Sequence, residues 1–595
     1  MALPNIPVDG DLDIGLLWLA QRRQTRLKPD NRQKNISNEL GARIMRSSIR
    51  RNFGIVLALV LLVNSESVLA QNTAKTAKNI VFIILDDLRF DGLGFLNPQV
   101  ETPNIDQLAA EGVYFSNAVV TTSLCSPSRA TILTGLTTQN HKIVDNNNTS
   151  EAGLVFFPRY LQEAGYETSF FGKWHMGRAN DSPREGFNRW VSFAGQGHYY
   201  PVKRSDGSSN VINVDGVHVE QRGYITDELT DYAVEWLESQ RDPDKPFLLY
   251  LSHKAVHSDA VPAPRHRGQY QDTAFKLPET VAVTDDYVNG KPMWVKNQRN
   301  SWHGIDFFYA SDRKMTDYLR DYYGALSSVD ESVGRLRAAL QASGLSEDTI
   351  IFFYSDNGFL TGDHGLIDKR NAYESSVKVP MIVYAPGDAK AGSKNPTRVR
   401  NLDLAPTFLD IAGIEKPAHF EGKSAWPLIT GIQDRQAWGE PDFLYQYYWE
   451  WTFPMTPTTL AITRGDIKYI QYHGVWDIEE LYDLSIDPQE LVNRINDPEY
   501  YSIRQELRRA LFAQAANPDG ENAIPYTPRL AEGINLRDKN GSKVAPFPRA
   551  WQVEPNRPDK LMGLIPDIPA KKKALDEGRV YAPWLQVPAE KSESN

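Results

Sequence analysis

Short apolar runs rich in β-branched and aromatic residues constrain the fold most strongly. The first reads NIVFIIL at residues 79–85, and similar runs occur at residues 167–171, 247–252, 349–354 and 379–384. Runs of this length without regular polar alternation are typical of strands buried on both faces of a sheet. Helical spacing occurs between them, at residues 102–111, 225–240 and 317–343. The alternation predicts an α/β fold in which helices sandwich a large, mostly parallel or mixed sheet.

The length predicts more than one structural unit, because 595 residues exceed what one hydrophobic core usually holds. We expect a main domain at residues 71–435. Strand-like segments at residues 443–451, 460–464 and 467–472, followed by a helix from Ser502, predict a smaller antiparallel sheet plus helix in residues 436–516. Residues 517–595 are rich in proline and predict an irregular extension. Two polar stretches, 178–222 and 280–312, are expected to be long loops that set specificity.

The N-terminal region has the pattern of a secretory signal. Arg46, Arg50 and Arg51 precede an apolar run at residues 53–63, and Val-Leu-Ala at 68–70 is a suitable cleavage site. We predict a signal peptide at residues 45–70, translation from Met45, and residues 1–44 as an extension created by a mis-set start codon. The resulting protein would be periplasmic or secreted, without stable membrane association, because the apolar run is too short to span a bilayer. The alternative is a membrane-anchored protein with a cytoplasmic extension.

The charge distribution argues against a nucleic-acid partner. The formal net charge is −10, and no basic domain or lysine run stands out. An anionic substrate would therefore need a local basic pocket.

Oxygen-bearing side chains follow two of the predicted strands. Asp86 and Asp87 come directly after the first run, and Asp356 and Asn357 come directly after the fourth. Ligands of parallel sheets bind beyond the carboxyl ends of the strands. Oxygen-only ligands suit a hard cation such as calcium or magnesium, and a helix-capping pair is the alternative for the two aspartates.

The chain has one cysteine, Cys125, so neither an internal disulfide nor a multi-thiolate metal site is possible. It begins the segment CSPSRATILTG, in which we expect a helix from about Pro127 to about Gly135. Cys125 would then lie at a helix N-terminus, where backbone N–H groups favour an anion. A buried small apolar side chain and a thiolate nucleophile are two interpretations. Cysteine phosphatases place an arginine six residues after the cysteine, whereas here that position is Thr131 and Arg129 is four residues after.

The segment at residues 125–135 resembles the signature of the formylglycine-dependent (type I) sulfatases of the alkaline phosphatase superfamily, Cys-x-Pro-Ser-Arg-x-x-x-Leu-Thr-Gly, at every specified position. Further segments resemble the family at residues 172–177 (GKWHMG), 252–257 (SHKAVH), 355–358 (SDNG), 368–370 (DKR) and 480–484 (ELYDL). The resemblance covers about residues 77–495. Segments 252–257 and 447–451 look similar to glucosamine-6-sulfatase-like and algal-polysaccharide (ulvan-type) sulfatases.

The resemblance implies a role for each matching residue. A maturation enzyme would oxidise Cys125 to formylglycine (3-oxoalanine), whose hydrate attacks sulfur and forms a covalent sulfo-enzyme. One calcium ion would be held by Asp86, Asp87, Asp356, Asn357 and the modified Cys125. Arg129 would hydrogen-bond the hydrate, Lys173 and Lys369 would bind the sulfate, His175 would accept a proton, and His257 would act as general acid to the leaving oxygen. His364 would either line the substrate pocket or stabilise its loop. Taken singly, the two lysines would be interpreted as surface residues and His175, His257 and His253 as structural.

The implied function is hydrolysis of a sulfate ester on a carbohydrate, with ulvan and glycosaminoglycans among the candidate polysaccharides or oligosaccharides. Two alternatives stay open at this point. A phosphonate or phosphodiester hydrolase could use the same scaffold, and a non-catalytic relative could bind carbohydrate without reaction.

Overall fold

The structure, a computed structural model, describes residues 78–147, 153–177, 180–203, 209–301, 303–311, 313–450, 452–473 and 477–515. The predicted signal peptide, residues 1–44 and the extension at residues 517–595 lie outside these residues. In the described part of the chain, no helix combines the length and apolar character needed to cross a membrane.

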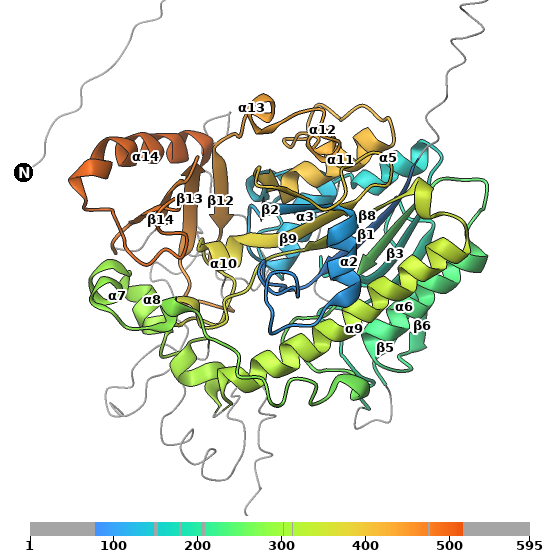
Figure 1. Ribbon diagram of the computed structural model, residues 1–595, viewed down its shortest axis with the longest axis horizontal. Helices are drawn as coiled ribbons and strands as arrows, with labels where there is room; N and C mark the ends of the chain where they lie inside the picture. The colour runs from blue at the N-terminus through green and yellow to red at the C-terminus, as the bar shows by residue number, and fades with distance from the viewer. Residues whose placement is uncertain are drawn as a thin grey trace, which may run out of the picture. The chain divides into compact units, whose positions relative to one another are not determined.

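A large mixed sheet forms the centre of the molecule (Figure 1). Its strands follow the order β10-β2-β9-β8-β1-β7-β3-β4-β5-β6, and β11 also pairs with β2. Their bounds are β1 Asn79–Leu85, β2 Val113–Val119, β3 Glu167–Lys173, β4 Arg189–Phe193, β5 Val211–Val214, β6 Val217–Glu220, β7 Phe247–Ser252, β8 Thr349–Ser355, β9 Lys378–Tyr384, β10 Ser393–Asn395 and β11 Val399–Arg400. The five predicted runs form β1, β3, β7, β8 and β9.

The position of strand β1 in the sheet explains why residues 80–85 are all apolar. Ile80, Phe82 and Ile84 face one hydrophobic core, and Val81, Ile83 and Leu85 face another. Each fully buried side chain of this size contributes about 2 kcal/mol to folding. Both faces of the strand are covered, and its one polar residue, Asn79, has hydrogen-bond partners in Thr349 and Phe247.

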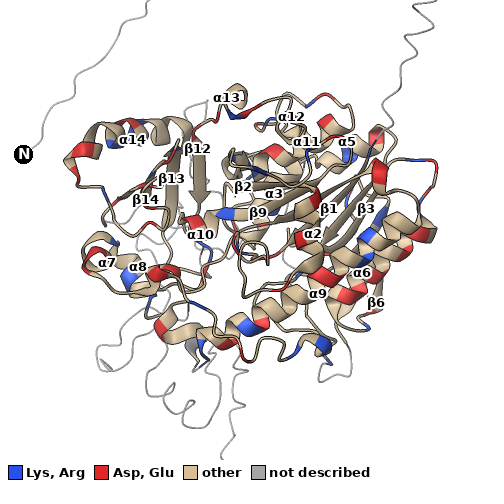
Figure 2. Cartoon of the chain, viewed as in Figure 1, with Lys and Arg blue, Asp and Glu red and all other residues tan. Residues whose placement is uncertain are grey.

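Helices cover both faces of the sheet. On one face lie α2 (Pro103–Glu111), α6 (Ile225–Glu235) and α9 (Met315–Ala342), and on the other lie α3 (Cys125–Thr134), α5 (Phe157–Glu163), α11 (Leu404–Ile411) and α12 (Trp426–Ile429). The remaining short helices are α4 Thr138–His141, α7 Asp285–Gly290, α8 Met293–Gln298, α10 Glu374–Val377 and α13 Arg435–Trp438. The predicted fold class is confirmed. Helix α6 carries only acidic charged residues, whereas acidic and basic residues both lie along α9 (Figure 2).

Strand direction places the functional residues at one edge of the sheet. Strands β8, β1, β7, β3 and β4 are parallel, whereas β9 is antiparallel to both of its neighbours, β8 and β2. Strand β2 therefore runs in the same direction as β1. The carboxyl ends of β1, β2, β3, β7 and β8 all lie at the same edge.

Two sequence expectations differ from the structure in this sheet. Strand β2 was not predicted, because Ser116 and Asn117 interrupt its apolar pattern where the pairing register with β9 shifts. Residues 178–222 were expected to be loop but contain β4 and the hairpin of β5 and β6. Both strands of that hairpin are short and lie at the sheet edge, so their sequences lack a long apolar run.

A second, antiparallel sheet comprises β12 (Phe443–Tyr447), β13 (Thr458–Arg464), β14 (Ile467–His473) and β15 (Glu480–Asp483). Helix α14 (Tyr501–Ala515) packs Leu507 and Leu511 against Leu460 and Ile462 of β13. This confirms the predicted small sheet plus helix. The backbone N–H of Gln446 in β12 donates to the carbonyl of Thr121, at 2.8 Å, so the small sheet contacts the segment that leads to α3. The domain bounds themselves remain a prediction.

Candidate active site

Four oxygen-bearing residues meet where β1 and β8 end. Leu85 of β1 pairs with Ser355 of β8, so Asp86 and Asp87 lie beside Asp356 and Asn357. All four side chains are buried. Carboxylate oxygens of Asp86, Asp87 and Asp356 lie within 4.8 Å of one another. Such crowding of buried negative charge calls for a cation.

The donor set fits a hard metal ion. The side-chain oxygen of Asn357 is buried and has no hydrogen-bond partner among the described residues, while its amide nitrogen donates to Asp87 at 2.6 Å. Burial and the neighbouring Asp86 raise the pKa of Asp356 to about 7, as expected for a carboxyl group that lacks a full set of positive partners. An unpaired amide oxygen beside three carboxylates suits calcium or magnesium.

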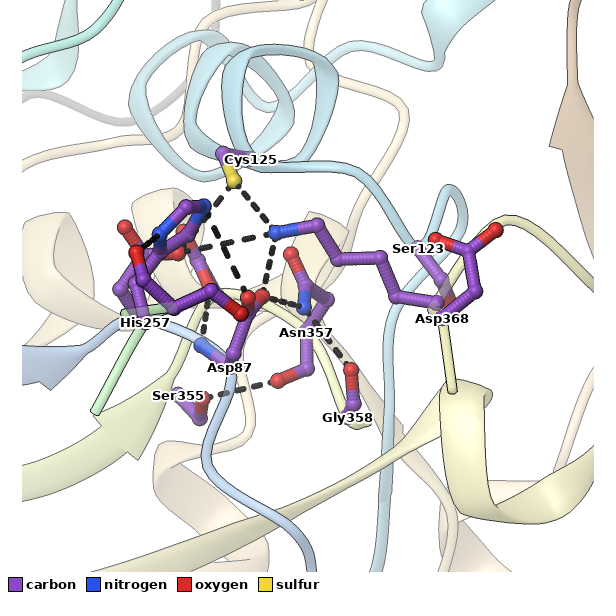
Figure 3. Close-up of polar contacts among 12 residues, drawn as sticks. Asp87, Ser123, Cys125, His257, Ser355, Asn357, Gly358 and Asp368 are labelled. Carbon is purple, nitrogen blue, oxygen red and sulfur yellow. Dashed lines mark hydrogen bonds and ion pairs between the residues drawn. The ribbon is translucent and has the colours of Figure 1, made fainter. Parts of the chain in front are cut away.

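Cys125 faces this cluster from the first residue of α3, with its sulfur directed toward Asp87 and Asn357 (Figure 3). The helix begins at Cys125, two residues before the predicted Pro127, and ends at Gly135 in a left-handed conformation. The sulfur lies 2.8 Å from the Lys369 ammonium nitrogen and 3.3 Å from an oxygen of Asp86. Burial and then Asp86 raise the pKa of the thiol to about 12. Cys125 is therefore protonated at neutral pH, which argues against a thiolate nucleophile.

Arg129 lies one helical turn after Cys125 and organises the three strand ends. Its guanidinium donates to Asp356 at 2.8 Å, to the Lys173 carbonyl at 2.7 Å and to the Ser252 hydroxyl at 2.6 Å. Its remaining terminal nitrogen, Nη2, has no hydrogen-bond partner among the described residues and lies 3.9 Å from Asp86. The side chain is thus fixed, with one donor still available at the site.

Two buried lysines supply positive charge to the same place. Lys173 ends β3 and donates to Asp86 and to the side-chain oxygen of Gln196. Lys369 lies in the loop after β8 and donates to Asp87 and Cys125. Burial alone would lower the pKa of Lys369, but Asp87 and Cys125 outweigh it and hold that pKa well above its usual value. The pocket is therefore locally basic within an acidic protein.

Two histidines complete the group. His257 follows β7 and places Nε2 3.8 Å from a carboxylate oxygen of Asp87, and His175 lies beside Ser126, whose hydroxyl is 3.4 Å from Nδ1. Burial, followed by the charge of Lys173, lowers the pKa of His175 well below its usual value. Burial also lowers the pKa of His257, with Asp86 opposing. Both rings are accordingly neutral and able to accept a proton.

The structure places His364 apart from this group. Its ring packs on Tyr373 with centroids 4.0 Å apart, and no hydrogen bond or ion pair between described side chains joins it to the carboxylates. It lines a cavity of about 410 Å³ together with Arg89, Asp363 and other residues. This packing favours the interpretation that His364 stabilises its loop. His253 is buried against Ser332 at 3.2 Å, in line with a structural role.

Three side chains around the site were not singled out from the sequence. Gln196 accepts from Lys173, Ser126 contacts His175, and Lys254 is buried over Tyr199. Gln196 and Tyr199 lie in the polar stretch expected to be a specificity loop, which is the one signal that could have pointed to them. Ser126 and Lys254 lie inside recognised motifs, but nothing in their residue types distinguished them from neighbouring positions.

The fold and this site define an α/β enzyme that handles an anionic ester at the carboxyl edge of its sheet. The sulfatase family model matches residues 78–414, a little over half of the chain, and the model for the C-terminal region of N-sulphoglucosamine sulphohydrolase matches residues 362–517. The chain belongs to the sulfatase family. It is accordingly a hydrolase of sulfate esters.

Several relatives act on carbohydrates. An N-acetylglucosamine-6-O-sulfatase of Bacteroides thetaiotaomicron is 32% identical in an alignment of 490 residues that covers 73% of this chain and 85% of the relative. An ulvan-active sulfatase of Formosa agariphila is 26% identical, over 82% of this chain and 91% of the relative. A protein solved in complex with its substrate D-glucosamine-2-N,6-O-disulfate is 31% identical, with a TM-score of 0.67 over 74% of this chain and 97% of that one. The phosphonate monoester hydrolase of Agrobacterium radiobacter, at 22% identity and a TM-score of 0.60, shares the fold.

Proposed function

We propose that the protein removes sulfate from a sulfated polysaccharide or oligosaccharide, with formylglycine formed from Cys125 as the nucleophile. One observation carries the proposal. Cys125, buried and protonated, faces three carboxylates, Asn357 and Lys369 at the carboxyl edge of the sheet. These surroundings suit a hydrated aldehyde and a sulfate group better than they suit a thiol. The carbohydrate sulfatases among the relatives support the substrate class.

Oxidation of Cys125 to formylglycine would supply the nucleophile that a protonated thiol does not provide. In its hydrated form, formylglycine offers an oxygen nucleophile for sulfur and a second hydroxyl whose deprotonation releases sulfate. Arg129 would hold the hydrate through its free terminal nitrogen. His175, neutral because it is buried, would accept the proton of the second hydroxyl.

Lys173 and Lys369 would bind the sulfate oxygens. Their ammonium groups both contact the carboxylate pair, Lys173 at Asp86 and Lys369 at Asp87. Charge that develops on the sulfate oxygens would be stabilised by these fixed cations. His257, on the side of Asp87, would meet the leaving oxygen and act as general acid after protonation.

Asp86, Asp87, Asp356 and Asn357 would hold one calcium ion, and the matured residue 125 would be its further ligand. The bound ion supplies positive charge that orients the nucleophile and one sulfate oxygen. Arg129 keeps Asp356 in place for this role through the 2.8 Å hydrogen bond. The N-terminal signal pattern supports export to the periplasm or the medium, where sulfated polysaccharides occur.

A screen of sulfate release tests the proposal. Purified, matured protein is incubated with oligosaccharides of heparin, chondroitin sulfate and ulvan, with an aryl sulfate, and with a phosphonate monoester and a phosphodiester. We expect release of inorganic sulfate from at least one saccharide. Preferential hydrolysis of the phosphorus substrates would support the alternative hydrolase instead, and binding without release would support the non-catalytic alternative.

A further inference from the structure

Lys254 differs from the other buried lysines of the described chain in its partners. Lys173 pairs with Asp86, Lys291 with Glu480, Lys369 with Asp87 and Lys468 with Glu490. Lys254 is as deeply buried, with 4% of its surface exposed, yet no carboxylate oxygen of the described residues lies within 4 Å of its ammonium nitrogen. A buried ammonium without a counter-ion is unfavourable, so this arrangement requires a functional reason.

The ammonium of Lys254 rests on an aromatic ring instead. Its nitrogen lies 4.9 Å from the centroid of the Tyr199 ring, a cation–π contact. Burial, and then the charge of Lys173, lowers the pKa of Lys254 to about 8, so the group is still mostly protonated at neutral pH. Asp86, Asp259 and Asp87 oppose this shift of the pKa, but none of these carboxylates forms an ion pair with the Lys254 ammonium within 4 Å.

The surroundings place Lys254 on the side of the leaving group. The Tyr199 hydroxyl donates to the carbonyl of His257 at 2.8 Å, and the N–H of His257 donates to the carbonyl of Lys254 at 3.1 Å. Lys254, Tyr199 and His257 are thus joined to one another, and the charges of Lys173 and Asp86 act on Lys254. With Lys173 and Lys369 assigned to the scissile sulfate in the proposed function, Lys254 would be available to a group on the attached sugar.

We propose that Lys254 binds a second anionic group of the substrate, a sulfate, sulfamate or carboxylate on the sugar that carries the scissile sulfate or on its neighbour. The inference rests on the proposed function and adds a specificity rule to it. The enzyme would select multiply charged saccharides over singly sulfated ones, because only the former give the buried ammonium a partner.

The test compares substrates that differ only in the second anion. Heparin oligosaccharides are used before and after N-desulfation and N-acetylation, and ulvan oligosaccharides before and after reduction of their carboxyl groups. For each pair, kcat/KM is measured with wild type, Lys254→Met, Lys254→Arg and the control Lys245→Met, which changes an exposed lysine. Thermal unfolding of each variant checks that it is folded.

We expect wild type to prefer the more highly charged member of the pair that it hydrolyses. Lys254→Met should reduce that preference about tenfold or more, as loss of one charge-assisted hydrogen bond implies. Lys254→Arg should retain much of the preference, and Lys245→Met should behave as wild type. An equal fall of kcat/KM for both members of a pair, or an unchanged preference in Lys254→Met, would overturn the inference. Failure of wild type to release sulfate from any saccharide would instead refute the proposed function.

Discussion

At the scale of the residue, Cys125 carries a side chain that its surroundings do not suit. The nearest polar atoms are the Lys369 ammonium at 2.8 Å and an Asp86 oxygen at 3.3 Å, and burial keeps the thiol protonated. A protonated thiol is a poor nucleophile. Hydroxyl groups at the same position could both accept from the lysine and donate to the carboxylates. This contrast supports the proposal that Cys125 is a precursor of formylglycine.

Replacing Cys125 with alanine should abolish turnover and leave the fold intact. Alanine fits the space and removes only a sulfur atom, so we expect a loss of about 1 kcal/mol of stability at most. Sulfate release should fall about a thousandfold or more, because the nucleophile is removed. Circular dichroism and thermal unfolding provide the stability measurement. Substantial activity in Cys125→Ala would exclude residue 125 as the source of the nucleophile.

Metal removal should lower activity, and calcium should restore it. In the metal-free site Asp356 has a pKa raised to about 7 by burial and by Asp86. Protons therefore compete with the ion below about pH 7, and the apparent calcium affinity should rise between pH 6 and pH 8 with release of protons. Calorimetric titration in two buffers of different ionisation enthalpy measures the apparent calcium affinity and the number of protons released. Full activity after exhaustive chelation would contradict the calcium site.

Residue types alone indicated part of the site. The paired carboxylates and the spacing after Cys125 could be interpreted from the sequence, because chemistry restricts what such groups do at strand ends. The contacts of Gln196 with Lys173 and of Lys254 with Tyr199 could not, since they join segments more than 20 residues apart through side-chain packing. The predicted roles of the catalytic residues remain predictions.

At the scale of the element, strand β3 places Lys173 at the site, and the residue before it, Gly172, has a backbone conformation that favours glycine. Gly172 has φ of 117°, and a Cβ there would lie 1.8 Å from the carbonyl oxygen of Ser252 in β7. Only glycine allows the two strands to approach so closely while Lys173 and Ser252 both contact Arg129.

Gly172→Ala should therefore destabilise the protein by about 3 kcal/mol or more and reduce activity. Gly165→Ala is a matched control, because Gly165 also has a positive φ, 94°, but no atom lies within 4 Å of the added carbon. We expect the control to cost about 1 kcal/mol. Chemical denaturation measures both variants, and equal losses would show that close packing at Gly172 is unimportant.

The elements themselves were largely predictable where both faces are buried. The five predicted runs are strands in which nearly all side chains are buried, and the small sheet follows from its own short apolar segments. The direction of β9 was not predictable, because a continuous apolar run is compatible with both a parallel and an antiparallel strand. Strand β2 escaped prediction because its polar residues fall at a shift in register.

At the scale of the whole molecule, a buried carboxylate of the small sheet contacts Tyr373 and Lys291, which lie outside both sheets. Glu480 of β15 accepts from the hydroxyls of Tyr373, Tyr472 and Tyr482, and its other partner is Lys291 at 3.4 Å. Tyr373 follows the loop that carries Lys369. The small sheet therefore contacts the segment that follows Lys369 and supports it from outside the large sheet.

Glu480→Ala should lower stability by about 3 to 5 kcal/mol, since it leaves a buried ammonium without its partner. Because the carboxylate fixes the segment of Tyr373, which follows Lys369, to the small sheet, we expect one shared unfolding transition at a lower temperature, with activity lost in parallel. Glu479→Ala is the control, as the carboxylate of this neighbour is partly exposed and 3.8 Å from Arg508, and it should cost less than about 1 kcal/mol. Separate transitions of the two sheets in wild type would contradict this coupling.

Mass spectrometry of residue 125 determines whether the cysteine has been converted to formylglycine. Trypsin releases residues 90–129 as one peptide, because no lysine or arginine lies between Arg89 and Arg129. In protein that releases sulfate, we expect this peptide to be about 18 Da lighter than the cysteine form and to carry an aldehyde that reacts with hydrazides. Full sulfatase activity in protein whose residue 125 is entirely unmodified cysteine would contradict a formylglycine nucleophile.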